Sequence, residues 1–119
     1  MVIYQKHIYR QDLRANPNVT YLFGDNTVQE GFAGQAKEMR GEPNAVGIPT
    51  KKYPNTYASA YFTDNEFESN KREIDDAFAR INTDIVVVPL DGLGTGLAEM
   101  PIRCPKTFKY LVDKIKALP

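Results

Sequence analysis

One short segment, Ile85–Pro89, limits the fold more than any other part of the chain. It reads IVVVP, a β-branched run that is polar at neither of its alternating positions. A strand with one wet face alternates apolar and polar residues, whereas a strand covered on both faces reads as a continuous apolar run. The segment therefore predicts a buried strand in a sheet that is packed on both sides.

The rest of the chain predicts strands that alternate with helices. Short apolar runs indicate the strands, and apolar residues at spacings of three, four and seven indicate the helices. The expected strands are 2–4, 19–23, 45–49 and 85–89, and the expected helices are 8–15, 34–40, Phe67 to Ile81, and Phe108 to Leu118 with Pro105 in a first turn. This order predicts one α/β domain over residues 1–119, with a mixed, mainly parallel sheet flanked by helices.

Composition excludes several classes of protein. The 15 Lys and Arg residues balance 15 Asp and Glu residues, so the chain lacks the surplus of positive charge that binds nucleic acid or a membrane surface by bulk electrostatics. The lone Cys104 excludes an internal disulfide framework and a cysteine zinc site, and we interpret it as a buried structural thiol. We expect no metal, no signal peptide and no spanning helix, and hence a cytoplasmic protein.

Small, polar or glycine-rich segments follow three of the expected strands. They are Gly24–Asn26 with Gly31–Gly34, then Pro49–Lys52, then Asp91–Leu97. In open α/β sheets, ligands bind beyond the carboxyl ends of the strands, so we expect these segments to meet at one site. The last segment lacks the spacing of a dinucleotide-binding fingerprint and the Lys-Ser/Thr pair of a P-loop.

Each segment also has a structural interpretation, which the sequence leaves open. Glycines at 92, 94 and 96 suit an anion cradle or a tight turn. Asn26 suits a ribose contact or a turn. The aromatic residues of the stretch after the second of these segments suit either a stacking wall or packing against the sheet; they are Tyr53, Tyr57, Tyr61 and Phe62.

Together, the three strand ends resemble a macrodomain. Phe23-Gly24-Asp25-Asn26 with Gly31-Phe32-Ala33-Gly34-Gln35-Ala36 is similar to the family's Asn-bearing strand end and the glycine segment that opens a helix. Pro89–Leu97 is similar to its later Pro-x-x-Gly-x-Gly loop, and Ile48-Pro49-Thr50-Lys51 to a Phe-Pro-Thr-Lys stretch in the antitoxin macrodomain of the DarTG system. The resemblance runs from about Thr20 to Pro101, and small phage-encoded proteins look similar.

The resemblance implies a minimal three-layer sandwich that binds ADP-ribose or a related, even cyclic, NAD-derived nucleotide without a further cofactor. A phage protein of this kind would sequester a signalling nucleotide in the host cytoplasm as an anti-defence protein. The implied ligand-binding residues are Asp25, Asn26, Gly31, Phe32, Ala33, Gly34, Gln35, Pro49, Thr50, Lys51, Asp91, Gly92, Leu93, Gly94, Thr95, Gly96 and Leu97.

The alternative is an ADP-ribosyl hydrolase that acts on modified protein or nucleic acid. The resemblance then implies catalysis by Lys51, with Glu99 or Asp91 as the acid/base. Some hydrolytic relatives have an acidic residue where this chain has Ala98, and Glu99 lies one residue beyond. Nucleic acid would be a partner only as the ADP-ribosylated substrate. A third hypothesis is an interaction module without a pocket, and a homo-oligomer would form through the shortened edge of the sheet.

Overall fold

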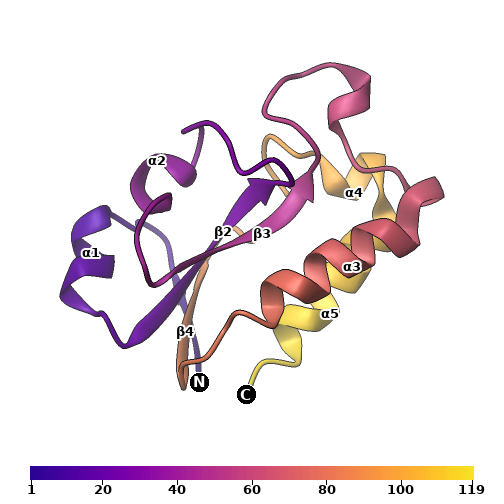
Figure 1. Cartoon of the computed structure of the whole chain (residues 1–119). Coiled ribbons are helices and arrows are strands. Elements are labelled where there is room, and N and C mark those ends of the chain that lie inside the picture. Colours follow the sequence, from indigo (N-terminus) through magenta and orange to yellow (C-terminus); the bar gives the residue numbers. More distant parts are fainter.

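The apolar run that constrains the fold is strand β4 (Ile85–Pro89), and it lies inside the sheet. The computed structural model describes residues 1–119. Strands β1 (Val2–Gln5), β2 (Val19–Asn26) and β3 (Ala45–Lys51) complete a four-stranded sheet in the order β1-β4-β2-β3 (Figure 1). Neighbours on both sides and helices on both faces explain why no position of β4 needs a polar side chain.

The sheet is wholly parallel, so the prediction of a mixed sheet is wrong in that detail. Each neighbouring pair of strands runs in the same direction, with Val2 opposite Val86, Thr20 opposite Val86 and Tyr21 opposite Ala45. An isolated antiparallel bridge joins Lys51 to Tyr61 outside the named strands.

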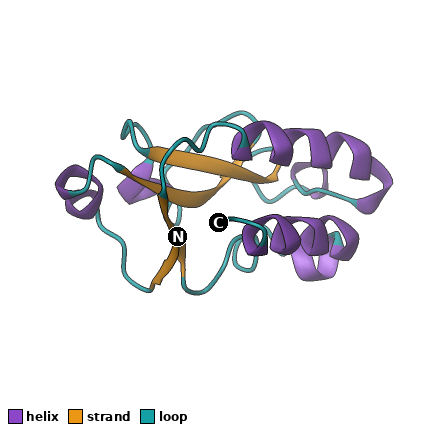
Figure 2. Cartoon of the chain, turned by 90° about the horizontal axis from the view of Figure 1, so that it is seen from below, coloured by secondary structure: helices purple, strands orange, loops and turns teal.

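Two long helices cover one face of the sheet. They are α3 (Phe67–Phe78) and α5 (Pro105–Lys116), which lie side by side in Figures 1 and 2. Their apolar stripes and the sheet enclose a core of 15 buried residues, among them Leu22, Val88 and Met100. This layer confirms the helices predicted from the spacing of their apolar residues.

Two short helices lie on the opposite side of the sheet, which gives the α/β/α arrangement of three layers (Figure 1). They are α1 (Arg10–Ala15) and α2 (Ala36–Met39), and their core holds only 7 buried residues. Alternation along β2 serves both layers, because Tyr21 and Phe23 face this smaller core while Leu22 faces the larger one.

Three further helical turns were not expected from the sequence. The 3-10 turns η1 (Ala58–Ala60) and η2 (Asp64–Glu66) follow β3, and α4 (Met100–Arg103) precedes α5. The carboxylate of Asp64 accepts hydrogen bonds from the N–H groups of Lys106 and Thr107 and from Thr107 Oγ1, each 2.9 Å long, and so caps the start of α5.

The lone thiol, Cys104, is buried at that helix start and belongs to the larger core, as predicted. Burial, with the nearby Asp64 carboxylate, raises the pKa of the Cys104 thiol to about 11, so the thiol stays protonated and unreactive. No helix of the chain is both long enough and apolar enough to cross a membrane.

Candidate functional site

A cavity of about 410 Å³ lies at the carboxyl ends of the parallel strands, where the sequence predicts a site. We call Gly31–Gln35 the early loop and Asp91–Ala98 the late loop, and both line this cavity. The ends of β2 and β3 line it as well, through Asn26 and Lys51 among others.

The structure brings nearly all of the predicted binding residues to this one cavity. Of the predicted set, only Pro49, which is buried within β3, lies outside the lining. The predicted acid/base Glu99 also lies just outside the lining. The lining also contains residues that were not among the predicted ligand contacts: Gly24, Glu30, Ala36, Arg40, Pro54 and Ala98.

The late loop presents a row of unpartnered backbone amides. No N–H group from Leu93 to Ala98 donates a hydrogen bond to any acceptor of the protein. Positive φ angles at Gly92 (87°) and Gly94 (80°) turn the chain, and the N–H of Met100 closes the loop on the carbonyl of Gly94 at 2.9 Å. Successive amides in such a turn form a concavity that binds anions.

Glycine at position 94 is a steric requirement as well as a conformational one. A Cβ atom there would lie 2.9 Å from Cγ of Met100 and closer still to its Sδ, and Met100 is fully buried. A Cβ atom on Gly96, by contrast, would meet no atom within 4 Å. The two glycines therefore have different roles within the same loop.

The early loop offers a second row of amides from the other side of the cavity. The N–H groups from Gly31 to Gln35 also have no partner within the protein, and φ is positive at Gly31 (89°) and Gly34 (59°). The helix expected over 34–40 is only the four-residue turn α2. The free amides of the loop itself, and not a helix dipole, therefore provide the attraction for an anion.

A buried ion pair fastens the early loop to β2. Both carboxylate oxygens of Asp25 accept hydrogen bonds from Arg40, at 2.5 and 3.1 Å, and Arg40 also donates to the carbonyls of Gly31 and Glu30 at 2.7 and 3.2 Å. A Cβ atom on Gly47 would lie 2.6 Å from Oδ2 of Asp25, so this glycine makes the space for the pair. Asp25 lines the cavity, but its oxygens already serve Arg40.

Asn26 also has a structural role, because its side chain is hydrogen-bonded to the backbone of Glu30. Its Nδ2 donates to the carbonyl of Glu30 at 2.8 Å, and its Oδ1 accepts from the N–H of Glu30 at 3.2 Å. The turn interpretation of Asn26 is thus confirmed. One N–H and one oxygen lone pair of the side-chain amide are left for a ligand in the cavity.

Lys51 provides a cationic side chain in the wall of the cavity. It is buried, its Nζ donates to the carbonyl of Asn55 at 2.9 Å, and Nζ lies 4.5 Å from the centre of the Tyr61 ring. Burial lowers the pKa of the Lys51 ammonium below its usual value, the Glu99 carboxylate partly offsets this, and the Arg103 guanidinium lowers the pKa further. The neighbouring Lys52 instead pairs with Glu66 at 2.5 Å.

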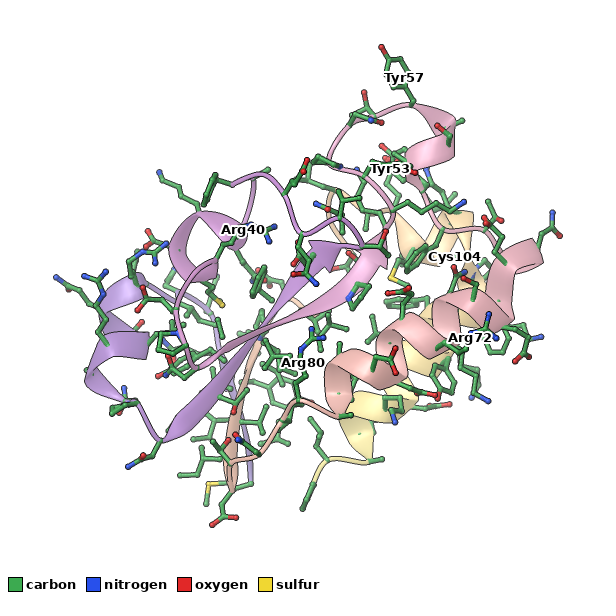
Figure 3. The ribbon with its side chains drawn as sticks, viewed as in Figure 1. Arg40, Tyr53, Tyr57, Arg72, Arg80 and Cys104 are labelled. Atoms are coloured by element: carbon green, nitrogen blue, oxygen red, sulfur yellow. The ribbon has the colours of Figure 1, made fainter.

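The four aromatic residues after β3 divide into two pairs. Tyr61 and Phe62 are buried, so packing is their role, whereas Tyr53 and Tyr57 are exposed. Figure 3 shows Tyr57 pointing away from the body of the molecule. The lining of the cavity by this stretch comes from Pro54 and not from a tyrosine.

Fold and site together define a parallel α/β domain that has a cavity between two glycine-containing loops, with free backbone amides on both sides and one buried lysine. The chain belongs to DUF7831, a family of unknown function whose model matches residues 3–114. No curated protein and no solved structure matches it.

Proposed function

We propose that this protein is macrodomain-like and binds ADP-ribose or a related NAD-derived nucleotide, cyclic forms included, in the cavity between the early and late loops. The observation that carries the proposal is the pair of facing loops whose backbone amides have no partner in the protein. Two such rows can hold the oxygens of a diphosphate without a basic surface, which suits a chain of zero net charge.

The size and lining of the cavity also suit a nucleotide. Its volume of about 410 Å³ lies in the range of small-molecule sites, roughly 300–1,000 Å³. Phe32 of the early loop and Leu97 of the late loop line the cavity and are about two-thirds exposed, so each loop adds an apolar side chain beside its free amides. Sugar and base faces pack on such side chains while phosphate oxygens accept from the amides.

A binding protein that does not cleave its ligand would remove a signalling nucleotide from its receptors. That role, an anti-defence function in the cytoplasm of a phage-infected host, is the form of the proposal that the resemblance favours.

Calorimetric titration tests the proposal. ADP-ribose and cyclic ADP-ribose isomers are titrated into the protein, with adenosine and ribose 5-phosphate as partial ligands. We expect saturable heat with a diphosphate ligand and none with adenosine. Gly94→Ala should abolish the heat. Gly41→Ala serves as the control, because Gly41 also has a positive φ angle but does not line the cavity. No heat with any of these ligands at about 1 mM, a level that corresponds to about −4 kcal/mol of binding, would refute the proposal.

Lys51 supports a second candidate function, the removal of ADP-ribosyl groups from protein or nucleic acid. A buried lysine with a lowered pKa in a cavity wall can act as a nucleophile or can stabilise charge at the anomeric carbon. Release of ADP-ribose from modified substrates is the assay. Lys51→Gln should end turnover, and Lys52→Gln is the matched control because Lys52 pairs with Glu66. Turnover that survives Lys51→Gln would exclude this mechanism.

A further inference from the structure

Two cations lie close to one buried aromatic ring, Tyr61, beside the cavity. The Arg103 guanidinium lies 3.6 Å from the centre of the Tyr61 ring, and Nζ of Lys51 lies 4.5 Å from the same centre. These two distances place both positive charges within about 8 Å of each other. An aromatic ring attracts a cation, but one ring that already serves a guanidinium at close range leaves the second cation facing a like charge.

Arg103 is held in this place from a second direction. Its Nε donates to Oε1 of Glu99 at 3.0 Å, and Glu99 has a left-handed backbone (φ 50°) directly after the late loop. A non-glycine residue in that region is strained and persists only where its surroundings fix it. Arg103 therefore connects the end of the late loop to Tyr61, and Tyr61 is joined to Lys51 by the antiparallel bridge.

We propose that Arg103 is a positioning residue for Lys51: packed on the Tyr61 ring and paired with Glu99, it holds the Lys51 side chain in the wall of the cavity and places a like charge near its ammonium group. Arg103 itself does not line the cavity. The groups that face Lys51 are few: the Asn55 carbonyl, the Tyr61 ring, and the opposed charges of Glu99 and Arg103.

This arrangement has a consequence for the proposed function. A fully charged lysine would act as a counter-ion for phosphate, whereas an amine with a free lone pair can attack an electrophilic carbon. The lowered pKa of Lys51 raises the fraction of its side chain that is in the uncharged form, and the use of that amine in catalysis rests on the proposed hydrolase. The position of Arg103 and its effect on Lys51 can be measured without any nucleotide.

Competitive acetylation of the ligand-free protein provides that measurement. A trace of acetic anhydride modifies each lysine at a rate set by its uncharged fraction, and mass spectrometry resolves the sites from about pH 7 to 11, a range that spans ordinary lysine titration. Lys52 and the exposed Lys109 are internal references in every sample. Circular dichroism and a thermal midpoint establish that each variant is folded.

Arg103→Gln should shift the midpoint of Lys51 to higher pH and lower its labelling rate near pH 8 by about three-fold or more, because the like charge is gone and Glu99 is released toward Lys51. Arg103→Lys should restore most of the rate. Glu99→Gln should move the midpoint the other way, since the attractive charge is lost.

An unchanged Lys51 midpoint in Arg103→Gln would overturn the proposal. Should Arg103→Gln fail to fold, Arg103→Met, whose uncharged stem can still pack on Tyr61, takes its place, and an unchanged Lys51 midpoint in that variant overturns the proposal. A shifted midpoint in a protein that shows no calorimetric heat with any nucleotide would support the role of Arg103 while refuting the proposed ligand.

Discussion

Three alanine substitutions in the late loop should destabilise the protein in a fixed order. Gly96→Ala adds a Cβ atom that meets nothing within 4 Å, and the φ angle of Gly96 is not positive. Gly92→Ala keeps free space around the new atom, with Thr95 no nearer than 3.7 Å, but forces a side chain to adopt a φ of 87°. Gly94→Ala combines a φ of 80° with a close approach to buried Met100.

The size of each effect follows from these differences. Gly96→Ala should change the free energy of unfolding by less than about 1 kcal/mol. Gly92→Ala should cost about 1–3 kcal/mol for the left-handed conformation. Gly94→Ala should cost about 2–6 kcal/mol, because displacement of a packed core side chain adds about 1–3 kcal/mol to the cost of the left-handed conformation. A loss at the upper end would consume much of the stability of a small domain, about 5–15 kcal/mol.

Equilibrium urea unfolding, followed by circular dichroism, measures the free energy of unfolding of all three variants. We expect its dependence on urea concentration, the slope of the linear extrapolation, to be the same in each. Unchanged slopes establish that the variants differ in stability and not in the compactness of the unfolded chain. A Gly94→Ala protein no less stable than Gly92→Ala would refute the packing of Met100 against the loop. A Gly96→Ala protein as unstable as Gly92→Ala would refute the assignment of left-handed backbone to only some of these glycines.

Further outcomes are expected elsewhere in the molecule. Asp25→Ala should lower the free energy of unfolding by about 3–5 kcal/mol in urea unfolding, since it leaves the Arg40 side chain, which is only 17% exposed, without its carboxylate; a loss below about 1 kcal/mol would contradict this. Burial alone would raise the pKa of Asp64, but hydrogen bonds from Lys106 and Thr107 lower it below its usual 3.8. The contribution of the Asp64 carboxylate to the free energy of unfolding is therefore complete above about pH 4 and is lost as the pH falls further. In Asp64→Asn, the free energy of unfolding measured over a pH series should therefore fall less at acid pH. Phe32→Ser should change the free energy of unfolding by no more than about 0.5 kcal/mol but weaken the binding of ADP-ribose measured by calorimetry; unchanged affinity would exclude Phe32 from the ligand-binding surface.

The fold was largely predictable because its central strand carries a strong local signal. The β-branched run Ile85–Pro89 matches β4 at both ends, and the long amphipathic helices were expected near their true positions. The helix expected over 34–40 is limited to Ala36–Met39 in the structure, because Gly34 has a positive φ angle and Arg40 has an extended backbone. A pattern of two inward residues in seven positions cannot reveal such dihedral angles.

The cavity was predictable from the rule that parallel strands present their carboxyl ends at one edge. Arg40 was missed because its pairing with Asp25 depends on how α2 packs on the sheet, and fifteen residues separate the two in sequence. The connection of Arg103 to Lys51 was missed for the same reason, since Tyr61 joins them only after the chain has closed a long loop. No local pattern encodes either contact.

The unequal cores on the two faces of the sheet have a consequence for motion. The early loop leads into α2, whose layer holds 7 buried residues, while the late loop is closed by Met100, a member of the 15-residue core. Segments with fewer buried apolar contacts open at lower free energy, so the amides of the α1/α2 layer exchange with solvent before those of the α3/α5 layer. The early loop is thus attached to the less stable layer of the molecule and the late loop to the more stable one, so we expect a ligand of the proposed site to enter by movement of the early loop.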